Sequence, residues 1–172
     1  MYTDRVKRRM IRGKIDVYLA QDSDFVTVNG HWVYRGAALE VEIPTHINGQ
    51  VVTSTSYMFN GNWNYAATPV TKVVLKHSNV TNMFSMFRSS SSTTLDLSNF
   101  DTSKVTDMGS MFRDSSATIL DLSSSDTSNV TGTSYLFRDS SATTGYARTQ
   151  ADANKFNASS HKPTGLNFVV KP

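Results

Sequence analysis

Residues 95–112 read Leu-Asp-Leu-Ser-Asn-Phe-Asp-Thr-Ser-Lys-Val-Thr-Asp-Met-Gly-Ser-Met-Phe, and this stretch decides the fold of the chain. Its second half matches Val-Thr-Asn-Met-Phe-Ser-Met-Phe at 80–87 and Val-Thr-Gly-Thr-Ser-Tyr-Leu-Phe at 130–137, and the three blocks begin 25 residues apart. A fixed period of that length is typical of a solenoid, in which each repeat buries its apolar face against its neighbours. The sequence therefore predicts one domain of stacked repeats.

Each repeat has two apolar patterns. The Leu-Asp-Leu of residues 95–97 alternates as in a strand whose leucines point inward. Val105, Met108 and Met111 are spaced like one face of a short helix. The sequence thus predicts an α/β repeat solenoid, a leucine-rich-repeat-like stack of strand-helix turns about 25 residues long. Serine and aspartate at fixed repeat positions are explained as turn and ladder residues.

The segments that flank the repeats predict caps. Residues 15–51 alternate apolar and polar side chains, and Asn-Gly pairs at 29–30 and 48–49 are strong hairpin signals. A hairpin-rich, antiparallel N-terminal cap should therefore cover residues 15–51, before the repeats at 52–143. Residues 144–172 contain a helix start at Thr149 and a closing strand with alternating apolar residues, so a helix-strand C-terminal cap is expected there.

Basic charge is concentrated in residues 1–14, which hold six basic side chains against Asp4, although the chain of 172 residues has a formal net charge of only +3. We expect this basic arm to anchor the protein to a partner within a homo-oligomeric or larger assembly. A solvated tail and phosphate contacts to nucleic acid are the alternatives, and nucleic acid is the least favoured. The arm's basic residues are Arg5, Lys7, Arg8, Arg9, Arg12 and Lys14.

The composition excludes several classes of protein. There is no cysteine, so neither disulfides nor thiolate metal sites can form. No run approaches the roughly 18 apolar residues of a membrane span. Residues 15–22 are too short and too charged for the core of a signal peptide. No export by the usual route and no membrane partner are therefore expected.

The repeats resemble the BspA-like leucine-rich repeats, also described as a mycoplasma lipoprotein-associated domain of the DUF285 type. Residues 95–112 carry the resemblance, which extends clearly over 52–143, while 145–171 look like the C-terminal cap often attached to such repeats. The resemblance implies a surface-displayed binding module without catalytic residues. The chain departs from it in having serines such as Ser115 where many members have a cysteine, and in lacking an export signal.

Two groups of residues are candidate ligand sites. The first is a ten-residue insertion after the first repeat block, where aromatic rings among asparagines would suit sugar binding; the alternative is that the rings fold back on the scaffold. The second is a column of arginines at one repeat position, which could bind a polyanion such as a wall teichoic acid or could be neutralised by neighbouring aspartates. These candidates are Trp63, Tyr65, Asn62 and Asn64 in the loop, and Arg88, Arg113 and Arg138 in the column.

Catalysis, metals and cofactors are not expected. The four histidines show no metal spacing, there is no glycine-rich phosphate loop, and the serines follow the repeat rather than a nucleophile motif. The leading hypothesis is a non-enzymatic structural or adhesion protein of a bacteriophage virion, in the tail, baseplate or head surface. Its arm would bind other virion proteins and its solenoid a host-surface glycan or protein. The alternatives are an extracellular bacterial cell-surface adhesin and an intracellular scaffold or nucleic-acid-binding protein.

Overall fold

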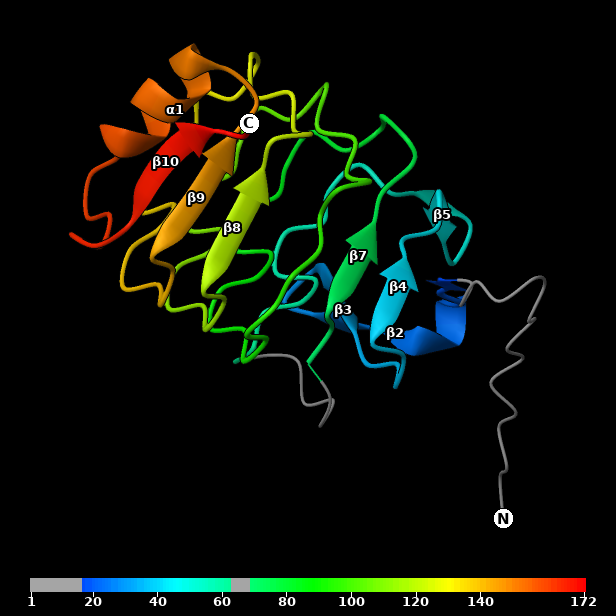
Figure 1. The fold of residues 1–172 in the computed structure, drawn as a ribbon. Coiled ribbons are helices and arrows are strands. Elements are labelled where there is room, and N and C mark those ends of the chain that lie inside the picture. The colour runs from blue at the N-terminus through cyan, green and yellow to red at the C-terminus, as the bar shows by residue number, and fades with distance from the viewer. Residues whose placement is uncertain (1–16, 63–68) are drawn as a thin grey trace, which may run out of the picture.

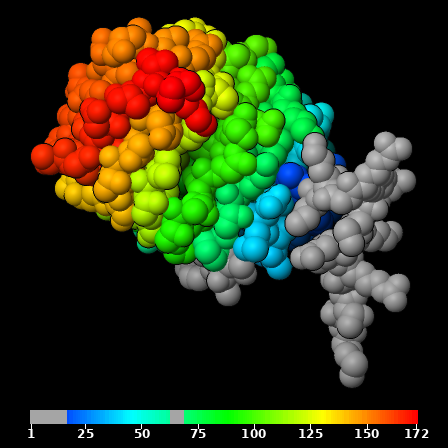
Figure 2. Space-filling model, viewed as in Figure 1, coloured from blue at the N-terminus to red at the C-terminus, as the bar shows by residue number. Residues whose placement is uncertain are grey.

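The protein is a β-solenoid of about six turns in a computed structural model that describes residues 17–62 and 69–172. The turns follow one another along the long axis, with the N-terminal strands at one end and the C-terminal helix at the other (Figure 1). In the space-filling view, successive turns form adjoining bands (Figure 2). The elements are β1 (Tyr18–Leu19), the 3-10 helix Asp22–Asp24, β2 (Phe25–Val28), β3 (His31–Tyr34), β4 (Glu40–Glu42), β5 (His46–Ile47), β6 (Gln50–Val51), β7 (Lys72–Val74), β8 (Ile119–Leu122), β9 (Thr144–Ala147), α1 (Gln150–Asn157) and β10 (Asn167–Val170).

The strands form two short parallel sheets along one side of the solenoid. Their orders are β1-β4-β7 and β10-β9-β8, and an isolated parallel bridge joins Lys72 to Asp96 between them. Two antiparallel pairs, β2-β3 and β5-β6, are added at the N-terminal end. The predicted repeat solenoid is therefore present.

The helix expected in each repeat is wrong for the described turns. In the segment that begins at Met83, three overlapping turns replace it, with backbone hydrogen bonds from Met86 to Met83, from Arg88 to Ser85 and from Ser90 to Phe87, each 3.2 Å long. The same pattern recurs from 108 to 115 and from 133 to 140. These turns place side chains inward at nearly the helical spacing, which is why the apolar pattern resembled that of a helix.

The remaining N–H groups of each such segment bond to the next turn. Ser85 N donates to Gly109 O at 2.9 Å, and Phe87 N donates to Met111 O at 3.0 Å. An α-helix would use these donors internally and leave neighbouring turns joined by side chains alone. The left-handed conformation of Ser85, with φ of 54°, lets donors point alternately within the turn and to the next one.

A column of phenylalanines forms the centre of the core. Phe59, Phe87, Phe112 and Phe137 stack face to face, with successive ring centroids 5.6, 5.9 and 6.2 Å apart and planes within 9° of parallel. All four are buried. Such pairs contribute about 0.5–1.5 kcal/mol each beyond their burial.

The N-terminal region contains both predicted hairpin turns, but it is not a separate antiparallel cap. Asn29-Gly30 joins β2 to β3 and Asn48-Gly49 joins β5 to β6, and all four turn residues have positive φ. However, β1 pairs with β4 in parallel and β4 pairs with β7. The first turns of the solenoid therefore lie within residues 17–51, because β4 buries Val41 on the same sheet as Val73.

The C-terminal end is closed by the predicted helix and strand. Thr149 caps α1 by accepting a hydrogen bond from Asp152 N. Phe156 of α1 and Phe168 of β10 pack on Phe137, with ring centroids 5.6 and 4.8 Å away. These rings cover the last apolar face of the phenylalanine column.

The side chain of Asn157 satisfies the outer edge of β10. Its Nδ2 donates to Phe168 O at 2.8 Å, and Phe168 N donates to its Oδ1 at 2.9 Å. The amide thus occupies the place that the backbone of a further strand would take. The adjacent carbonyl of Leu166 accepts a hydrogen bond from Lys162 Nζ.

Candidate functional site

The predicted loop leaves the solenoid beside the predicted arginine column. Gly61 N donates to Arg88 O at 2.8 Å, and Asn62 Nδ2 donates to Ser89 Oγ at 3.2 Å. A Cβ atom at Gly61 would lie 1.9 Å from the Ser89 carbonyl oxygen, so only glycine permits this approach. The root of the loop is therefore fixed to the turn that begins the column.

The other loop candidates and the basic arm lie outside the described residues. These are Trp63, Asn64 and Tyr65, and Arg5, Lys7, Arg8, Arg9, Arg12 and Lys14.

Arg88, Arg113 and Arg138 stand at the same position in three consecutive turns, as the sequence predicts. The backbone carbonyl of each accepts a hydrogen bond from the preceding turn, with N–O distances of 2.8–2.9 Å. Adjacent strands and turns paired in this way lie about 4.8 Å apart. The guanidinium groups therefore form a row that runs parallel to the solenoid axis.

Two aspartates neutralise part of this row. Asp114 Oδ2 lies 3.8 Å from Arg88 Nε and 3.3 Å from Arg113 Nε. Asp139 Oδ2 lies 3.0 Å from Arg138 Nε. Because such half-exposed pairs contribute at most about 1 kcal/mol each, an anionic ligand can compete with them. Three arginines paired with two aspartates leave the row with a net charge of +1.

Aromatic side chains adjoin the arginine row, and the sequence argument missed them. Tyr57 and Tyr135 occupy one repeat position, and Phe84 contacts Tyr57 with ring centroids 5.6 Å apart. The guanidinium carbon of Arg138 lies 5.4 Å from the centre of the Tyr135 ring. We call this surface the turn face, which comprises the outward side chains of residues 57–62, 84–89, 109–114 and 134–139. Alignment of the repeats could have revealed the two tyrosines.

A histidine packs on each of the two tyrosines. The ring of His31 lies 4.8 Å from that of Tyr57, and the ring of His161 lies 4.9 Å from that of Tyr135. Tyr135 nevertheless remains 39% exposed, and Tyr57 and Phe84 are half-buried. Neither Phe84 nor the two tyrosines belong to the core cluster, and the Tyr135 ring is the most exposed of the three.

Conspicuous aspartates away from the turn face stabilise turns, as the sequence predicts. Asp96 Oδ1 accepts from Ser98 N at 2.9 Å, and Asp126 Oδ1 accepts from Ser128 N at 3.0 Å. Burial alone would raise the pKa of Asp96, but the hydrogen bonds from Lys72 and Ser98 outweigh it and lower the pKa to about 2. The bonds from Ser128, helped by Arg148, lower the pKa of Asp126 to about 2. Both groups are fully charged at neutral pH and engaged in structure.

Among residues 17–62 and 69–172, no three histidine or acidic side chains are grouped so as to hold a metal ion. Within the same residues, no helix has the length and apolar character that crossing a membrane requires.

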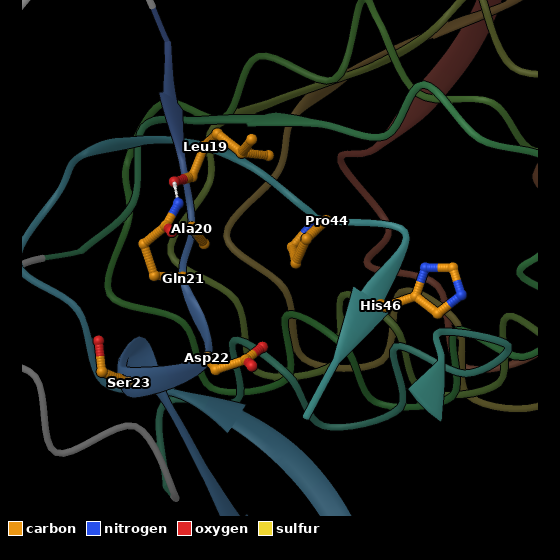
Figure 3. Close-up of a pocket in the computed structure, with 7 residues that line it drawn as sticks. All are labelled: Leu19, Ala20, Gln21, Asp22, Ser23, Pro44 and His46. Carbon is orange, nitrogen blue, oxygen red and sulfur yellow. Dashed lines mark hydrogen bonds between the residues drawn. The ribbon is translucent and has the colours of Figure 1, made fainter. Parts of the chain in front are cut away.

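A cavity of about 390 Å³ lies at the N-terminal end, between β1 with the following 3-10 helix and the segment that leads into β5 (Figure 3). Three of its polar side chains already have partners. Gln21 Nε2 donates to Leu19 O at 2.7 Å, Asn48 N donates to Asp22 Oδ1 at 2.9 Å, and His46 Nδ1 lies 3.0 Å from Thr45 Oγ1. The turn face, in which three arginines share two aspartates and adjoin aromatic rings, is the better candidate for ligand binding.

Together, the stacked turns and the turn face define a repeat protein of the solenoid class. A family model described as a Mycoplasma protein of unknown function, DUF285, matches residues 33–162, and the chain belongs to this family. The family is related to the BspA-like repeats that the sequence resembles. Neither the curated proteins nor the solved structures contain a match to the chain.

Proposed function

We propose that the protein is a non-enzymatic binding module whose turn face engages a partner at a biological surface. The observation that supports this most is the convergence of the loop root at Asn62 with the row of Arg88, Arg113 and Arg138. Binding residues are found most often on loops and outward positions that a rigid scaffold holds in place. The inward and turn-forming positions, by contrast, are occupied by the core and by hydrogen bonds between turns.

The proposal extends to the setting in which the module works. It is a structural or adhesion component of a bacteriophage virion, with residues 1–14 binding other virion proteins and the solenoid displayed outward. The six basic side chains of residues 1–14 support an anchoring role, because they would complement an acidic protein surface. Mass spectrometry of purified particles tests this setting. Presence of the chain at fixed stoichiometry is expected, and its recovery only from the bacterial cell surface would indicate the adhesin alternative.

Binding of the labelled full chain to intact bacterial cells tests the role of the turn face. We expect the combined variant Arg88→Gln, Arg113→Gln and Arg138→Gln to lose at least about tenfold in affinity. The matched control is Arg148→Gln, because Arg148 also forms an exposed ion pair, 2.9 Å from Asp126, but lies outside the turn face. Equal binding by the triple variant and the parent would refute the proposal.

A further inference from the structure

The turn face presents two parallel rows of different chemistry. One row is made of the guanidinium groups of Arg88, Arg113 and Arg138. The other contains aromatic rings, with Tyr57 and Phe84 towards one end and Tyr135 towards the other. The 5.4 Å contact between Arg138 and Tyr135 shows that the rows adjoin. A ligand that follows the solenoid axis would touch both rows together.

We propose that this surface binds an acidic polysaccharide, with the sugar chain lying along the solenoid axis. The inference rests on the proposed binding role of the turn face and names its ligand class. Guanidinium groups pair with carboxylates, and aromatic rings offer flat apolar surfaces to the apolar faces of sugar rings. Polyphosphate would satisfy only the arginine row, and a neutral glycan only the aromatic row.

The spacing of the turns favours a polymer with an acidic group on every sugar. Consecutive arginines are one turn apart, which is about 4.8 Å, and this is close to the advance of one unit in an extended sugar chain. In a twofold extended polyuronate, the carboxylates on one side of the chain recur at every second sugar, so they can pair with Arg88 and Arg138, which lie two turns apart. Phe84 and Tyr135 lie two turns apart, so the same chain would meet a ring at every second sugar.

A glycine in the next turn lets the Phe84 ring lie along the solenoid axis. Gly109 occupies the repeat position of Phe84 in the next turn, and a Cβ atom there would lie 3.0 Å from Phe84 Cδ2. Ser110, which occupies the position of Tyr135 in the preceding turn, is 4% exposed. The Phe84 ring therefore lies against this turn, so a sugar that follows the axis would meet the outer side of Phe84 first and Tyr135 beyond it.

The ion pairs of the arginine row suit exchange with a ligand. Asp139 is 63% exposed at its side chain and contacts one arginine, so it can swing into solvent when a carboxylate replaces it. Asp114 lies between Arg88 and Arg113, at the longer distances of 3.8 and 3.3 Å. Because the aspartates neutralise only part of the row, electrostatic attraction favours the binding of a polyanion. The affinity should therefore fall as the salt concentration increases.

The experiment is isothermal titration calorimetry of the full chain with oligogalacturonates of two to eight units. Affinity should rise with length to about four units, which span the four turns of the turn face, and then change little. The double variant Phe84→Ala and Tyr135→Ala should bind the six-unit oligomer at least about tenfold more weakly. Tyr146→Ala is the matched control, because Tyr146 is a half-buried tyrosine on β9 outside the turn face.

Inorganic polyphosphate and neutral maltohexaose separate this inference from the proposed function. Equal binding of polyphosphate and oligogalacturonate, unchanged in the aromatic double variant, would overturn the acidic-polysaccharide inference while leaving a binding role for the arginine row. Undetectable binding of the oligogalacturonates, or tighter binding of maltohexaose, would overturn it also. Thermal unfolding of each variant shows that the fold is retained. Failure of the proposed function itself would appear separately, as equal cell binding by the arginine triple variant and the parent.

Discussion

Replacement of Asn157 by alanine would remove the side chain that closes the C-terminal edge of the solenoid. Both hydrogen bonds between its amide and the Phe168 backbone would be lost, at 2.8 and 2.9 Å. Each is worth about 1 kcal/mol net, and alanine at the end of α1 returns up to about 0.7 kcal/mol of helix propensity. The variant should therefore be less stable by about 1.5 kcal/mol, which lowers Tm by about 3–6 °C for a chain of this length.

Thermal unfolding followed by circular dichroism measures this loss, with Asn154→Ala as the matched control. Asn154 is exposed on the same helix, and its side chain accepts only an exposed hydrogen bond from Gln150 at 2.9 Å among the contacts of the described residues. The propensity gain is similar in both variants, so their difference isolates the edge contacts. Equal Tm values for the two variants would refute the reasoning.

Self-association provides a second readout of the same change. In the parent, the outward N–H and carbonyl of Phe168 are occupied by Asn157, so another strand cannot pair there. Removing the amide exposes these groups beside Val169 and Val170, which are 43% and 40% exposed. An unpaired apolar edge of this kind recruits other strands. Sedimentation velocity should show concentration-dependent association of Asn157→Ala and none for Asn154→Ala.

Three further predictions test the core, the loop root and the turn aspartates. Phe112→Ala should lower the free energy of unfolding by about 3–5 kcal/mol in urea titrations, because it breaks the buried stack; a loss below 1 kcal/mol would contradict the role of the stack. Gly61→Ala should destabilise by about 1–3 kcal/mol, whereas Gly165→Ala, whose Cβ meets nothing within 4 Å, should have little effect; equal effects would exclude the close contact at the loop root. The pKa values of Asp96 and Asp126 are lowered from 3.8 to about 2, so the stability that their charged forms contribute is present above pH of about 4 and is lost as the pH falls towards 2; a constant urea midpoint over that range would contradict this.

The solenoid could be predicted from the sequence because the same residues recur at a fixed period. In the structure, each of them packs on its equivalent in the next turn. Phe87, Phe112 and Phe137 recur at steps of 25 and lie in one column. The helix prediction failed because Met83, Met86 and Phe87 have helical spacing, and overlapping turns bury the same side chains. Apolar spacing alone does not reveal whether an N–H donor bonds within its turn or to the next one.

The extent of the solenoid was harder to predict than its repeat. β1 and β4 lack the repeat motif, and the pairing of Val41 with Val73 spans a chain separation that no local pattern reports. The two Asn-Gly hairpins suggested an antiparallel cap, although they interrupt a parallel stack. Which strand pairs with β4 depends on how the neighbouring turns pack over its apolar face. That packing exists only once the turns are assembled.

In the candidate site, some side chains are positioned by their own turn and others by the neighbouring turn. The arginine row follows directly from the repeat alignment, because each arginine belongs to one turn. The position of Phe84, however, depends on the absence of a side chain at Gly109 in the following turn. Likewise, the loop at Asn62 leaves beside Arg88 because Gly61 approaches the backbone of Ser89 in the next turn. The candidate surface is thus specified between turns, so residues 25 to 28 positions apart must be compared together to find it.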